Sequence, residues 1–199
     1  MRLSVVTFVV VMLTAGIAAA EERERGFADV YYGMTKLFES DVSNWTFEDE
    51  RGVTGLRAGL WLNDASTLAL TLRTWYVQTD AKEQRSGPSD LAFLGVSLEL
   101  LMRWKLSDRW ALYGTVGPMM AVTTLDMAPV LRGREDDSRS VAPGASTSVG
   151  VEVRVFSNVR AFAEMQGSLV YPDFEFFHDT TVSPRLTNLY GLFGLRMPF

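Results

Sequence analysis

Apolar and polar side chains alternate one by one along much of this chain. The clearest case runs from Thr147 to Val155, where a threonine or a valine stands at every odd position. The even positions between them hold Ser148, Gly150, Glu152 and Arg154. Successive side chains of a β-strand point to opposite faces, so a period of two over this length predicts a strand with one apolar and one polar face.

Other segments follow the same rule and are separated by turns or by polar stretches. They are residues 29–35, 55–62, 68–73, 94–103, 110–116, 159–169 and 189–199. The longer ones reach the ~9–11 residues that a tilted strand needs to cross a lipid bilayer. Together with the first segment they predict eight membrane-spanning strands.

Short and long connections alternate between these segments. The short ones are residues 63–66, 105–108 and 157–158, and the long polar ones are residues 39–52, 78–90, 124–143 and 172–187. Tight turns at one rim and longer loops at the other are typical of outer-membrane barrels, whose short turns face the periplasm. With an even number of strands, both termini are expected on the periplasmic side.

Aromatic residues cluster near the ends of the expected strands. One group flanks the short turns and consists of Trp61, Trp104, Trp110 and Phe156; the other lies near the opposite strand ends and consists of Trp75, Tyr76 and Tyr171. Aromatic belts of this kind form at membrane–water interfaces, whereas a soluble sandwich places its large rings in mid-strand. We therefore predict an all-β fold, a transmembrane antiparallel up-and-down barrel of eight strands.

The polar faces of the strands carry many charges that would point into the barrel. These inward candidates are Asp29, Arg57, Arg73, Glu99, Arg103, Glu152, Arg154, Arg160, Glu164 and Arg196. An eight-stranded barrel has an interior just wide enough for side chains to fill, and buried charges are costly unless they pair. We expect an interlocked polar plug, an interpretation that the bulky Tyr31, Tyr113 and Tyr190 on the same faces favour. An arginine-lined pore and a small-ligand site are the alternatives.

The first twenty residues have the features of an export signal. Arg2 supplies a positive start, residues 3–16 are almost entirely apolar, and Ala18, Ala19 and Ala20 fit a small-residue cleavage site. We expect residues 1–20 to be removed and residues 21–199 to form one barrel domain. An uncleaved membrane anchor is the alternative.

Composition narrows the function classes further. The formal net charge of −5 argues against nucleic-acid binding, which requires a basic face, and the absence of cysteine excludes disulfides and thiol chemistry. Residues 48–50 and 135–137 are acidic clusters that could bind a divalent cation, but neither has the spacing of a known metal loop. We expect solvated loops there, no metal site and no cofactor.

The last segment of the chain carries a more specific pattern. It ends on Phe199, with Met197, Leu195 and Phe193 at alternate positions before it and Gly194 among them. It resembles the C-terminal targeting signal of bacterial outer-membrane barrels, although Pro198 and Leu192 depart from the usual pattern.

Over residues 27–199 the architecture resembles the small OmpA/OmpX-type and opacity-like outer-membrane barrels. That resemblance implies insertion by the barrel-assembly machinery, delivery by periplasmic chaperones, and contact with outer-membrane lipids and lipopolysaccharide. We expect a monomer.

Some eight-stranded barrels are enzymes that modify lipid A, so catalysis needs a separate test. The single histidine, His178, has Asp179 beside it and Thr180, Thr181 and Ser183 nearby, which are the ingredients of a base-activated hydroxyl. The lipid A deacylase barrels carry His-x-Ser-Asn on a strand, whereas here the serine and asparagine are missing and the segment is an expected loop. The stretch before the first strand is too short for the amphipathic helix of the palmitoyltransferase barrels. We assign no catalytic residue.

These observations favour a barrel with a structural role in the envelope, or a role in surface interactions through four extracellular loops. A lipid A hydrolase or acyltransferase that uses His178 is the second hypothesis. A narrow channel is the third.

Overall fold

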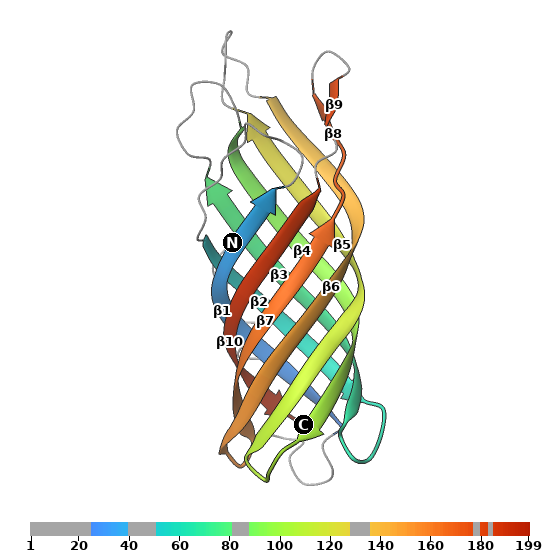
Figure 1. The fold of residues 1–199 in the computed structure, drawn as a ribbon, viewed down its shortest axis with the longest axis vertical. Helices are drawn as coiled ribbons and strands as arrows, with labels where there is room; N and C mark the ends of the chain where they lie inside the picture. Colours follow the sequence, from blue (N-terminus) through green and yellow to red (C-terminus); the bar gives the residue numbers. More distant parts are fainter. Residues whose placement is uncertain (1–24, 40–50, 81–87, 128–135, 177–179, 183–184) are drawn as a thin grey trace.

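The computed structural model describes residues 25–39, 51–80, 88–127, 136–176, 180–182 and 185–199 (Figure 1). Eight long strands form one closed barrel: β1 (Gly26–Glu39), β2 (Arg51–Trp61), β3 (Leu68–Asp80), β4 (Pro88–Lys105), β5 (Trp110–Met127), β6 (Asp136–Phe156), β7 (Val159–Val170) and β10 (Leu186–Pro198). Their order around the barrel is β1-β10-β7-β6-β5-β4-β3-β2, and every neighbouring pair is antiparallel. No helix in these ranges is long and apolar enough to cross a membrane.

The first and last strands close the barrel. Strands β1 and β10 pair without interruption from Phe27↔Pro198 to Glu39↔Leu186. Beyond that ladder, the carbonyl of Phe199 accepts hydrogen bonds from the backbone N–H groups of Arg25 (2.7 Å) and Gly26 (2.9 Å). The last residue of the chain therefore belongs to the closing seam.

Three neighbouring strands are much longer than the alternating pattern predicts. Strands β4 and β5 have 18 residues each and β6 has 21, so most of the stretch 124–143, expected to be a polar connection, is strand. The expected boundaries were wrong because residues of low strand propensity are held in the sheet by their cross-strand partners. All three strands extend at the end opposite the short turns, as Figure 1 shows.

A small hairpin stands outside the barrel order. Strands β8 (Phe174–Phe176) and β9 (Thr180–Val182) pair with each other, within the stretch 172–187 that was expected to be a loop. In Figure 1 the hairpin projects beyond the barrel wall at the end opposite the short turns. The eight-stranded prediction holds for the barrel, and this hairpin is an addition to it.

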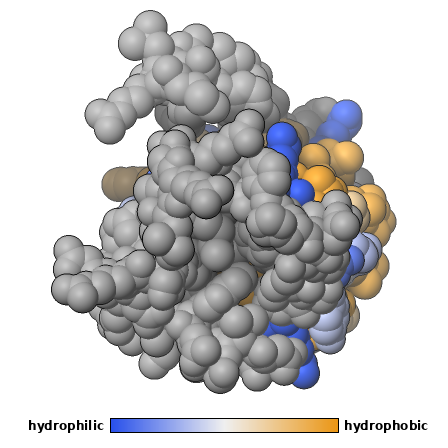
Figure 2. Space-filling view, turned by 90° about the horizontal axis from the view of Figure 1, so that it is seen from above, coloured by the Kyte–Doolittle hydropathy of each residue, from blue (hydrophilic) through white to orange (hydrophobic). Residues whose placement is uncertain are grey.

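The predicted division into two faces is confirmed. In β4, for example, the Leu98 side chain points outward and is 49% exposed, whereas its neighbour Glu99 points into the barrel and is fully buried. Every barrel strand exposes at least one leucine, valine or methionine side chain on its outward face, and Figure 2 shows hydrophobic residues on the outer wall. The barrel therefore has an apolar outside and a polar, charged inside.

Two of the aromatic predictions were wrong. Trp104, Trp110 and Phe156 are exposed near the short turns, as expected, but Trp75 is 1% exposed inside the barrel and half-buried Trp61 packs on the Phe27 ring. Trp75 lies two positions after Arg73 in the same strand, so the alternation places both side chains on the inner face. Proximity to a strand end was a poorer guide than the alternation itself.

Candidate functional site: the charged lumen and the cavity at the turn end

The lumen is occupied by a continuous network of ion pairs, and Arg57 lies in its middle. The Arg57 Nε atom lies 2.6 Å from Asp29 Oδ2, and its Nη1 atom lies 2.9 Å from Glu164 Oε2. All three side chains come from different strands and are at most 4% exposed. One guanidinium thus joins β1, β2 and β7 across the interior.

A second arginine continues the network toward the short turns. Arg196 donates from Nε to Asp29 Oδ1 at 2.8 Å and from Nη2 to Asp29 Oδ2 at 2.9 Å. Its Nη1 donates to Glu152 Oε2 at 2.6 Å, and Glu152 also forms an ion pair with Arg103. Such two-pronged arginine–carboxylate contacts fix geometry as well as charge.

The other branch runs toward β3 and β4. Arg73 lies 2.6 Å from Glu164 Oε1 through Nη2 and 3.3 Å from Glu99 Oε2 through Nε. The other Glu99 oxygen accepts hydrogen bonds from the hydroxyls of Ser97 (2.8 Å) and Ser146 (2.7 Å). Each carboxylate in this part of the lumen is therefore contacted by more than one donor.

Aromatic rings complete the filling of the lumen. The Tyr113 hydroxyl donates to Glu164 Oε2 at 2.6 Å, and the Arg196 guanidinium lies 4.1 Å from the centre of the Phe27 ring. Closer to the loop end, Trp75 Nε1 donates to the Tyr190 hydroxyl at 3.1 Å. Paired charges and aromatic rings together occupy the interior, as the plug prediction expected.

Nine of the ten predicted inward charges are buried in the lumen, and Arg154 is the exception. Arg154 is exposed where the β6–β7 register shifts, between Arg154 and Phe156, close to the turn. Its inward direction was predicted correctly, because Arg154 has the same parity as buried Glu152, but at this strand end the interior opens to solvent. The inward position of Phe162 also escaped the sequence reasoning, although its parity with Glu164 indicates it.

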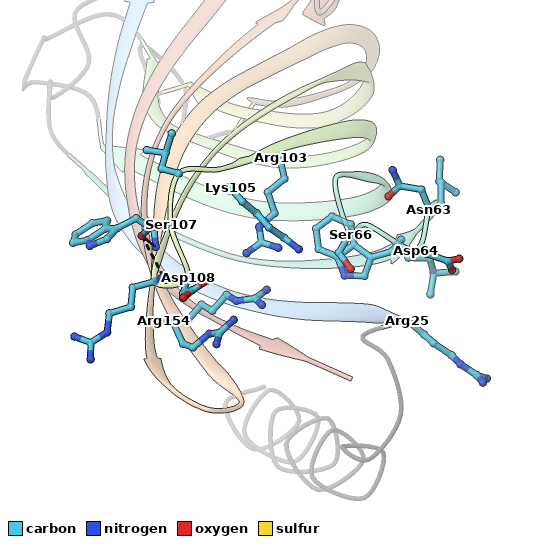
Figure 3. Close-up of a pocket in the computed structure, with 16 residues that line it drawn as sticks. Arg25, Asn63, Asp64, Ser66, Arg103, Lys105, Ser107, Asp108 and Arg154 are labelled. Carbon is cyan, nitrogen blue, oxygen red and sulfur yellow. Dashed lines mark hydrogen bonds between the residues drawn. The ribbon is translucent and has the colours of Figure 1, made fainter.

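A cavity of about 1240 Å³ lies beneath the network at the turn end of the barrel. Its lining includes buried Arg103, the side of Trp61, and residues of the turns after β2 and β4. Figure 3 shows Arg103, Lys105 and Arg154 directed toward its centre, while Arg25 points away. Cationic side chains therefore converge on this space from β4 and β6.

Several sequence-derived candidates fall outside the described residues. His178 and Asp179 are among them, as are the export signal at 1–20 and the acidic cluster at 48–50. The side chains of 135–137 are likewise not described. Among the side chains that are described, no three histidine, cysteine or carboxylate groups gather to hold a metal ion.

Comparison with known proteins identifies the fold. No family model and no curated protein matches the chain. Among solved structures it is similar to Neisserial surface protein A (NspA), with a TM-score of 0.60 and 18% identity over 90% of this chain and 100% of that one. OprG of Pseudomonas aeruginosa gives 0.60 and 13% identity over 89% and 97% of the two chains. Ail, the attachment invasion locus protein of Yersinia pestis, gives 0.56 and 11% over 88% and 100%.

The chain has the fold of the small eight-stranded outer-membrane barrels. The fold class predicted from the alternating pattern is confirmed.

Proposed function

We propose that this protein is an outer-membrane barrel that anchors a surface-exposed structure, and that it does not conduct solutes through its lumen. The observation that carries the proposal is the filled interior. Arg57, Arg73 and Arg196 are at most 1% exposed and each is paired with two carboxylates. A water-filled pore would leave such charges hydrated rather than paired with one another.

The outer wall supports the membrane placement. Leucine, valine and methionine side chains are exposed along all eight barrel strands, which water disfavours and lipid accepts. Trp104, Trp110 and Phe156 mark one edge of this band, and Tyr76 and Tyr171 mark the other. The tryptophan and tyrosine rings prefer this interfacial depth because each combines an apolar ring with a polar N–H or O–H group.

The long strands indicate where interactions take place. Strand β6 has 21 residues, about twice the ~9–11 that cross a bilayer, and the excess lies at the loop end. That end of β4, β5 and β6 would extend a rigid sheet beyond the lipid headgroups. The names of the similar proteins, a surface protein and an attachment invasion locus protein, are consistent with an interaction role at this end.

The route to the membrane belongs to the same proposal. The export-signal features support removal of residues 1–20. The resemblance to outer-membrane barrels supports chaperone delivery and insertion by the barrel-assembly machinery. We expect a monomer, because one chain closes the barrel on itself.

Labelling of single cysteines tests the orientation, since the native chain contains none. Arg139→Cys places a thiol at an exposed position near the loop end of β6, and Asn158→Cys places one on an exposed short turn. A membrane-impermeant maleimide should label the first variant in intact cells and the second only after the outer membrane is opened. The opposite labelling pattern would show that the barrel has the inverse orientation. Labelled protein found only in the soluble fraction would show that it is not in the membrane.

Planar-bilayer recording tests the closed lumen. The purified barrel should give no steady conductance above the lipid background, because the paired arginines leave no continuous water path. Stable single-channel steps that change when Arg73 is replaced by glutamine would establish a channel instead.

A further inference from the structure

We propose that the cavity at the turn end is a binding site for a phosphate group. The turn end faces the periplasm if the proposed orientation holds, so the ligand would come from the periplasm or from the inner leaflet of the outer membrane. The inference rests on two independent observations, the unpartnered donors in the cavity lining and the charge of that lining.

Buried donors without acceptors line this cavity. Arg103 is 6% exposed, and its Nε and Nη1 atoms make no hydrogen bond to any residue that the structure describes. The buried Nε1 atom of Trp61 likewise makes no hydrogen bond to the described residues. The Arg103 guanidinium lies 5.7 Å from the Trp61 ring centre. Buried N–H groups are nearly always paired in folded proteins, so this cluster of donors calls for an acceptor.

The charge of the lining has the opposite sign to that of the chain. Six cationic side chains line the cavity against two carboxylates, Asp64 and Asp108, in a protein of formal net charge −5. The six are Arg25, Arg103, Lys105, Arg109, Arg154 and Arg160. Glu152 forms ion pairs with Arg103, Arg160 and Arg196, so a single negative charge is shared by three cations and leaves the set net positive. A cavity lined this way concentrates anions.

Phosphate fits this lining better than a simple halide or a single carboxylate. It offers several acceptor oxygens to N–H donors that arrive from β2, β4 and β6, and it suits the planar guanidinium fork. Leu62, Leu106 and Trp110 are also exposed in the cavity lining, beside the cations. Apolar and cationic side chains side by side suit the phosphate of an amphiphile as well as a free phosphate, and the experiment separates these two sources.

The indole N–H resonance of Trp61 reports on the site directly. The folded barrel, labelled with ¹⁵N and held in a maltoside detergent free of phosphate, is titrated at constant ionic strength with inorganic phosphate. A parallel titration uses short-chain phosphatidylglycerol, with short-chain phosphatidylcholine for comparison. We expect the Trp61 signal, assigned with Trp61→Phe, to move as its N–H gains an acceptor. The Trp75 signal should stay in place, because its N–H already donates to Tyr190.

Paired variants decide whether the shift belongs to this cavity. Lys105→Gln/Arg154→Gln removes two exposed cations of the lining, leaves Arg103 and the lumen network intact, and should weaken binding about tenfold or more. Arg139→Gln/Arg185→Gln removes the same charge from exposed positions near the loop end and should leave binding unchanged. Both variants must retain heat-modifiable gel mobility, which shows that the barrel is folded.

The outcomes separate the sources of phosphate and can overturn the site. A Trp61 shift with inorganic phosphate supports the site and assigns it to a soluble phosphate. A shift with phosphatidylglycerol alone supports the site and assigns it to a lipid headgroup. No shift with either ligand, or equal affinities in the two paired variants, would overturn the proposal.

Discussion

The indole ring of Trp75 lies against the backbone of Gly95, its direct cross-strand partner in the β3–β4 ladder. A Cβ atom placed on Gly95 would lie 2.4 Å from Trp75 Cε2. The same relationship recurs between direct partners around the lumen, at Tyr31–Gly55, Phe27–Gly59, Tyr113–Gly150 and Phe162–Gly194. Each of these five inward rings thus covers a glycine, which leaves room for an aromatic side chain inside a narrow barrel.

Gly95→Ala should destabilise the barrel by about 1–3 kcal/mol, because the methyl group forces Trp75 out of its place. Urea unfolding of the barrel from lipid vesicles, followed by tryptophan fluorescence, measures the change. Gly191→Ala is the matched control, since its added Cβ would meet no atom within 4 Å. Combining Gly95→Ala with Trp75→Ala should show non-additive costs. Equal effects of the two glycine variants would contradict the ring–glycine packing.

Glu164→Gln should be among the most damaging single substitutions in the lumen. Glu164 binds Arg57, Arg73 and Tyr113, so its loss leaves two buried guanidinium groups with fewer partners. Breaking a buried pair in this way typically costs about 3–5 kcal/mol. The free energy of unfolding in urea should fall accordingly, while Asp173→Asn at an exposed position should change it by less than about 0.5 kcal/mol. An unchanged free energy of unfolding in Glu164→Gln would mean that water, not the network, satisfies these charges.

Leu98→Arg tests the lipid-facing side of β4. Leu98 points outward in mid-strand, and an arginine at the bilayer midplane of a barrel costs about 2–4 kcal/mol. Asn158→Arg, on an exposed turn, should cost about 0–1 kcal/mol because it lies outside the hydrocarbon. Vesicle-based unfolding gives both numbers. Similar costs at the two positions would argue that the apolar band is not in lipid.

Phe199 is expected to matter for assembly through both its backbone and its ring. Deleting it removes the hydrogen bonds to Arg25 and Gly26 that extend the β1–β10 seam. Phe199→Ala keeps those backbone bonds and removes only the ring, so the two variants separate seam closure from recognition of the terminal aromatic residue. Both should lower the amount of heat-modifiable protein in outer membranes, and the deletion should lower it more. Normal assembly of both variants would make the terminal resemblance accidental.

The two faces of the barrel could be predicted because alternation is a local property. Leu98 and Glu99 are adjacent in a strand, so one must face outward and the other inward whatever the rest of the chain does. The same rule identified nine buried lumen charges and also the inward direction of Arg154, which is exposed because it lies at the open turn end. For Trp75 the alternation was right, and the error came from judging the residue by its nearness to a strand end.

The sequence by itself determined the strands, their two faces, the short turns and the class of barrel, because each of these follows from neighbouring residues along one strand. Only the tertiary structure decided which charges meet. Asp29 binds Arg196, 167 positions away, because closure of the barrel places β1 beside β10. It also decided that β6 runs from Asp136 and that unpartnered donors line a cavity under the network. These features depend on strand register and barrel closure, which bring distant residues together and which no local sequence pattern predicts.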